Sequence, residues 1–74
     1  MRDDFHRACR AIIAGYANPY ARAYATAGLA MMGNEAIRVQ ALYILGNLNG
    51  WRGDVARATK RDLRRIAGLP NRRG

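Results

Sequence analysis

The sequence has few of the residues that staple small proteins together or carry them across membranes. Its 74 residues include a single cysteine, Cys9, so no intramolecular disulfide can form, and this usage is typical of a reducing compartment. The longest apolar run is the five-residue stretch 41–45, which is too short for a membrane span or a signal peptide. These shortages predict a soluble, cytoplasmic protein that does not engage a membrane.

Groups that could carry out chemistry are also scarce. The one histidine, His6, lies a helical turn from Cys9, and no acid is placed to orient its imidazole as a nucleophile–base pair requires. Two such ligands are too few for a zinc site. The five acids are expected at helix starts and in ion pairs, as for Asp62 with Arg65, and there is no glycine-rich phosphate loop. We therefore expect a protein that is not an enzyme and has no cofactor, catalytic residue or metal site.

Basic residues, in contrast, are abundant and unevenly placed. Thirteen Lys and Arg against five acids give a formal net charge of +8, and residues 51–74 hold eight of the basic residues but only two acids. The codon bias of a GC-rich genome is one explanation for the preference for Arg over Lys, but it explains the concentration of charge at one end less well. So positive a segment attracts nucleic acid, a nucleotide or an acidic protein face.

The first half of the chain has helical periodicity. Apolar residues step by four, three and four through a first helix, which Asp3 or Asp4 would cap: Phe5, Cys9, Ile12 and Tyr16. Pro19 leaves two arrangements open. Asn18 caps a separate second helix with Pro19 at its first position, or one kinked helix continues to about Met32. We favour the kinked helix because the apolar stripe continues past the proline: Tyr20, Tyr24, Ala27 and Met31.

The second half predicts two further helices. Asn34 would cap a helix with this core stripe: Ile37, Ala41, Ile44, Leu45 and Leu48. Three more apolar residues widen the stripe, so this helix is central or shared with a partner: Val39, Leu42 and Tyr43. A basic helix would then run over residues 54–67, capped by Asp54 and ended by Gly68 and Pro70, with this buried face: Val55, Thr59, Leu63 and Ile66.

The predicted fold class is an all-α, small bundle of three to four helices with a C-terminal helical hairpin, completed by oligomerisation. Residues 1–70 form the single helical domain and residues 71–74 a basic tail. Oligomerisation is expected because so short a chain buries a smaller fraction of its surface than a larger domain does, and fourteen of its apolar residues are alanine.

The candidate ligand-binding residues are the cations of the last helix and its flank, together with two aromatic rings: Arg52, Arg57, Lys60, Arg61, Arg64, Arg65, Trp51 and Tyr43. Guanidinium groups suit phosphates because they are planar, always charged and donate hydrogen bonds in pairs. The plainer alternatives are a solvated basic face and a Trp51 that closes the core against Leu48 and Val55. Tyr16, Tyr20 and Tyr24 could stack on bases, although such a ladder is more often core or interface.

The stretch from Tyr43 to Ala56 resembles a pattern in small phage-encoded proteins of uncharacterised function, roughly Tyr-Ile-Leu-x-Asn-Leu/Ile-x-x-Trp-Arg-Gly-x-x-Ala before a basic helix. It falls here on Tyr43, Ile44, Leu45, Asn47, Leu48, Trp51, Arg52, Gly53 and Ala56. Residues 20–29 look similar as well, and Pro19 departs from the pattern. The resemblance implies a phage origin and action inside a bacterial host, where small proteins without catalytic residues commonly work by binding.

Three functions remain open. The basic helix could hold nucleic-acid phosphates without reading sequence, since no helix-turn-helix, zinc-finger or RNA-binding signature accompanies it. An oligomer could instead sequester a host nucleotide signal as an anti-defence protein, with Arg52 on the phosphate and Trp51 or Tyr43 on the base. In the third, the apolar face of residues 37–48 binds a host or phage protein, with charge providing only steering.

Overall fold

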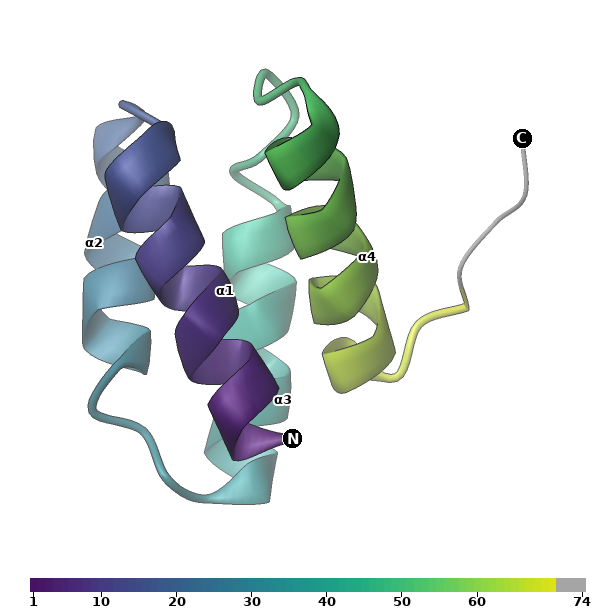
Figure 1. Ribbon diagram of the computed structural model, residues 1–74. Coiled ribbons are helices and arrows are strands. Elements are labelled where there is room, and N and C mark those ends of the chain that lie inside the picture. The colour runs from purple at the N-terminus through teal and green to yellow at the C-terminus, as the bar shows by residue number, and fades with distance from the viewer. Residues whose placement is uncertain (71–74) are drawn as a thin grey trace.

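The computed structural model describes residues 1–70, which form a bundle of four helices that run alternately up and down (Figure 1). The helices are α1 (Arg2–Gly15), α2 (Pro19–Gly28), α3 (Asn34–Leu45) and α4 (Asp54–Ala67). The predicted all-α class is confirmed. None of these helices is long and apolar enough to cross a membrane. The predicted basic tail, residues 71–74, lies outside the described residues.

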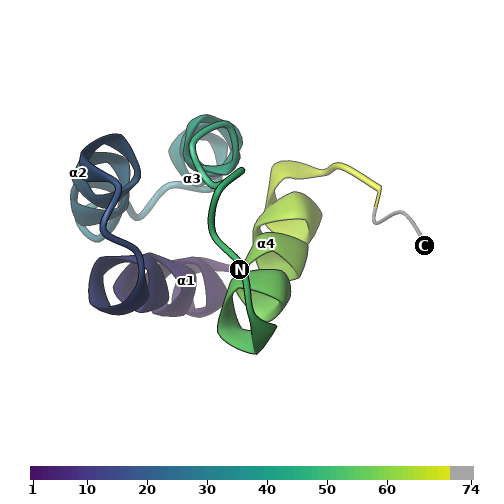
Figure 2. The same cartoon turned by 90° about the horizontal axis from the view of Figure 1, so that it is seen from above.

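The four helices surround one apolar core. α1 packs against α2 and α4, and α3 packs against α4 and more loosely against α2, whereas α2 and α4 do not touch (Figure 2). The largest fully buried side chains come from α1, α3, α4 and the loop between the last two: Phe5, Ile12, Ile37, Ile44, Leu48 and Leu63. The stripes predicted for the first and third helices therefore do face the core, although Tyr16 and Leu45 are only half-buried, and Tyr16 and Leu48 lie beyond the ends of α1 and α3.

The helix is interrupted before Pro19. The single kinked helix that we favoured is therefore wrong, and the alternative of two separate helices is right. α1 ends at Gly15, and the Asn18 side-chain oxygen accepts hydrogen bonds from the backbone N–H groups of Tyr20, at 2.9 Å, and Ala21, at 3.0 Å. Asn18 has extended backbone angles, which a following proline favours, and Pro19 needs no partner at the first helical position. Both features start a new helix.

The break changes which face of α2 is buried. Its inward residues are small, namely Ala21, Ala25 and Gly28, whereas Tyr20 is 69% exposed and Tyr24 38%. The predicted stripe through these tyrosines is wrong because it carried the register of α1 across the proline. Small residues let α2 approach α1 closely, since a Cβ on Gly28 would stand only 2.9 Å from the sulfur of Cys9.

Three predicted helix caps are also wrong, because the residues lie one or more positions inside their helices. The observed N-cap residues of α1, α3 and α4 are Met1, Gly33 and Gly53. Asp3, Asp4 and Asp54 lie in first turns, where they still face the positive end of the helix dipole, and Asn34 is the first residue of α3. At Gly53 the reason is its φ of 110°, which favours glycine.

α4 has the predicted bounds, and Gly68 ends it in the left-handed conformation, with the Leu69 N–H donating to the Arg64 carbonyl at 2.8 Å. Thr59, Leu63 and Ile66 are buried as expected. The fourth predicted member of that face, Val55, is 61% exposed, and Ala56 is buried in its place. The basic side of α4 therefore remains open to solvent.

Candidate anion-binding recess

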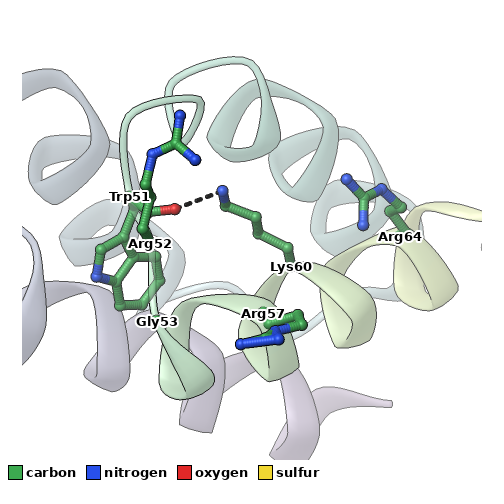
Figure 3. Close-up of a pocket in the computed structure, with 6 residues that line it drawn as sticks. All are labelled: Trp51, Arg52, Gly53, Arg57, Lys60 and Arg64. Atoms are coloured by element: carbon green, nitrogen blue, oxygen red, sulfur yellow. Dashed lines mark hydrogen bonds between the residues drawn. The ribbon is translucent and has the colours of Figure 1, made fainter. Parts of the chain in front are cut away.

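An open recess of about 440 Å³ lies between the loop that precedes α4 and one face of that helix. It is lined by Trp51, Arg52, Gly53, Arg57, Lys60 and Arg64 (Figure 3). Positions 57, 60 and 64 are three and four residues apart, so they share one side of α4, and Arg52 is brought to the same place by the turn at Gly53. We call this feature the cationic recess.

Lys60 links the helix to the loop. Its ammonium group donates a hydrogen bond to the backbone oxygen of Trp51 at 2.6 Å, and Figure 3 shows Arg52 beside the same carbonyl and Arg64 further along α4. Burial lowers the pKa of Lys60, and the positive charges of Arg64 and Arg52 lower it further. The recess therefore has a positive electrostatic potential, which would attract an anion and be reduced by its binding.

The cations of the recess are poorly compensated by acids. Within residues 1–70, no carboxylate lies within salt-bridge distance of Arg52, Lys60 or Arg64. Arg57 pairs with Asp54 at 2.8 Å, but both side chains are largely exposed, and such surface pairs are weak because water screens them. An anion could displace Asp54 from Arg57 at little cost.

Two of the predicted arginines lie outside the cationic recess. Arg65 contacts Asp4 of α1 and the predicted partner Asp62, each at 3.3 Å, so it ties α4 to α1. Arg61 is exposed and does not line the recess. From the sequence, Arg61 and Arg65 were assigned to the same helix face as Arg57 and Arg64. The angular spacing of residues around a helix does not show where the preceding loop packs against it.

The two predicted aromatic residues have separate places. Trp51 is 7% exposed, and its ring stacks on Tyr16, with centroids 5.6 Å apart, and lies against Gly15. Its burial fits the predicted place at the end of the core, although Val55 is 61% exposed, and the face of its ring that meets Tyr16 is unavailable to a base. Tyr43 is on α3, 6.0 Å from the ring of Tyr24, and does not line the recess.

His6 and Cys9 have packing roles. His6 Nε2 lies 2.8 Å from the backbone oxygen of Met31, which connects α1 to the segment before α3. Cys9 is fully buried, and this burial raises the pKa of its thiol to about 11, so it remains protonated at neutral pH. Within the described residues there is also no group of three or more potential metal ligands.

Comparison with known proteins identifies no relative: no protein-family model, no curated protein and no solved structure matches this chain. The residues that line the cationic recess are therefore the basis for inferring the function.

Proposed function

We propose that the protein binds phosphate groups of a nucleotide or nucleic acid in the cationic recess and does no chemistry on them. The observation that carries this proposal is that Arg52, Lys60 and Arg64 line one recess and that, within residues 1–70, no carboxylate lies within salt-bridge distance of any of the three. Burial lowers the pKa of Lys60, and the positive charges of Arg64 and Arg52 lower it further; a bound phosphate would offset the second effect by supplying negative charge. Guanidinium and ammonium donors both suit phosphate oxygens.

The arrangement favours a compact phosphate ligand over a long polyanion lying along the helix. The lining cations come from one loop and one side of α4, while neither Arg61 nor Arg65 lines the recess. A continuous track for a nucleic-acid backbone would be expected to use these arginines as well.

Titration calorimetry with pyrophosphate tests the proposal. Arg64→Gln should weaken binding about tenfold, since it removes one charge-assisted contact of roughly 1.5 kcal/mol. Arg38→Gln is the matched control because it removes the same charge from an exposed position on α3. No binding at low salt, or equal weakening by the two substitutions, would contradict a defined site, because bulk charge alone would then explain the attraction.

A second proposal is self-association through the outer surface of α2 and α3. This surface, here called the apolar face, carries Tyr20, Tyr24, Val39, Leu42 and Tyr43, all at least 38% exposed. The ring centroids of Tyr24 and Tyr43 lie 6.0 Å apart across the two helices, and exposed apolar groups that lie together commonly mark an interface. A second copy of the chain is the occupant we infer, since α2 and α3 hold only Arg22, Glu35 and Arg38 as charged residues. Pairing here keeps the strongly basic α4 helices apart.

Native mass spectrometry tests the self-association. Tyr43→Glu should convert the oligomer to a monomer because it buries a charge in the interface. Leu69→Glu, at another exposed apolar position outside the apolar face, should leave the oligomer intact. A monomeric wild-type protein at micromolar concentration would refute the second proposal and leave the phosphate site unaffected.

A further inference from the structure

A second recess adjoins the cationic recess. It has a volume of about 420 Å³ and lies between the end of α1 and the first turn of α4. Its walls are Ala11, Ala14, Gly15, Val55 and Ala56, with Trp51, Arg52, Gly53 and Asp54 along one edge. Trp51, Arg52 and Gly53 line both recesses, so the two share one rim. We call this feature the apolar recess.

The two recesses differ in chemistry. The cationic recess presents Arg52, Lys60 and Arg64, whereas six of the nine residues that line the apolar recess are alanine, glycine or valine, and the others are Trp51, Arg52 and Asp54. Small side chains leave an open, flat surface that a planar ring can cover, and removing such a ring from water is favourable. At the edge, Arg52 and Asp54 offer a donor and an acceptor for the polar groups of a ring.

The start of α4 lies between the recesses. Gly53 is its N-cap residue and no side chain caps the helix, so the first-turn N–H groups keep hydrogen-bonding capacity beside both recesses. A helix start of this kind adds favourable interaction with negative charge to that of the nearby cations.

We propose that the ligand is a nucleotide whose phosphates occupy the cationic recess and whose base lies in the apolar recess. This inference rests on the proposed function, and it adds the class of ligand and the residues that select it. A bare phosphate compound would use only the cations, whereas a nucleotide also covers the surface of Ala14, Gly15 and Val55.

The experiment compares ADP with pyrophosphate, which share a diphosphate but differ in the nucleoside. We expect wild-type protein to bind ADP at least tenfold more tightly, and ADP to change the fluorescence of Trp51, the only tryptophan and a residue of both recesses. Ala14→Leu should abolish the preference by filling the apolar recess while leaving pyrophosphate binding unchanged. Ala14 is exposed near the end of α1, so leucine is expected to be tolerated there.

The control is Ala23→Leu, which adds the same side chain at an exposed position of α2, away from both recesses, and should keep the preference. Equal affinities of wild-type protein for ADP and pyrophosphate, or a preference that survives Ala14→Leu, would overturn the inference and leave the phosphate site standing. Failure to bind either compound would instead refute the proposed function. If Ala14→Leu did not fold, an unchanged Trp51 emission in wild-type protein saturated with ADP would still overturn the inference.

Discussion

At the residue scale, Lys60 has the most consequential environment in the molecule. It is the only lysine, and it lies between two arginines with its ammonium group on the backbone oxygen of Trp51. The sequence identified Lys60 as a candidate through its place on a basic helix. It could not identify the carbonyl partner, because that contact depends on how the loop before α4 closes over the helix. The same contact fixes where the loop can present Arg52.

Gly28 is a position at which the packing leaves no room for a larger side chain. We expect Gly28→Ala to lower the free energy of unfolding by about 1–3 kcal/mol, because its Cβ would stand 2.9 Å from both Cys9 Sγ and Phe5 Cζ. Gly46→Ala is the matched control, since Gly46 has right-handed helical angles and its nearest neighbour would be a carbonyl oxygen at 3.5 Å. Urea unfolding followed by circular dichroism measures both. Equal effects would show that α1 and α2 are packed less tightly than described.

Cys9 gives the fold a pH dependence in the alkaline range. Burial raises the pKa of its thiol from 9.0 to about 11, so between these values the unfolded chain releases the proton and the folded chain retains it. The free energy of unfolding should therefore fall by up to about 2–3 kcal/mol as the pH rises from 9.0 to about 11. Below pH 9.0 the thiol is protonated in both states, so the full stability is present there. Urea unfolding of Cys9→Ala should lack this part of the decline. Parallel pH profiles for the two proteins would refute the prediction.

At the element scale, the helices were predictable, but three of their cap residues and the break before α2 were not. The apolar spacing within α1, α3 and α4 located three helices, because periodicity survives inside an uninterrupted element. Across Pro19 it failed, since a proline that begins a helix resets the register, and Tyr20 and Tyr24 consequently moved from the expected core to the surface. The caps were displaced for a different reason, because Gly33 and Gly53 supply the extended or positive-φ geometry that precedes the expected cap residues.

The start of α2 depends on one side chain. Asn18→Ala should destabilise the protein by about 1 kcal/mol, because the N–H groups of Tyr20 and Ala21 lose their acceptor. Asn18→Asp should retain most of the stability, since aspartate caps helices about as well as asparagine. Thermal unfolding by circular dichroism distinguishes them. An unchanged melting temperature of Asn18→Ala would indicate that Pro19 alone defines the start of the helix.

At the scale of the whole molecule, the cationic recess and part of the apolar face lie on helices that do not touch. Figure 2 shows α2, which carries Tyr20 and Tyr24, apart from α4, with α1 and α3 between them. The sequence predicted the basic segment from composition alone. It could not separate the cations that line the recess from Arg61, which lies outside it, or from Arg65, which binds Asp4 of α1, because the position of α1 beside α4 is a property of the tertiary fold.

The most direct test of the central claim is the pKa of Lys60, followed by NMR in protein labelled with ¹³C-lysine. The signal is unambiguous because the sequence contains one lysine. If phosphates bind in the cationic recess, the pKa of Lys60 should be below its ordinary value in the free protein and should rise when pyrophosphate saturates the site. A pKa of Lys60 that is the same with and without saturating pyrophosphate would contradict the account.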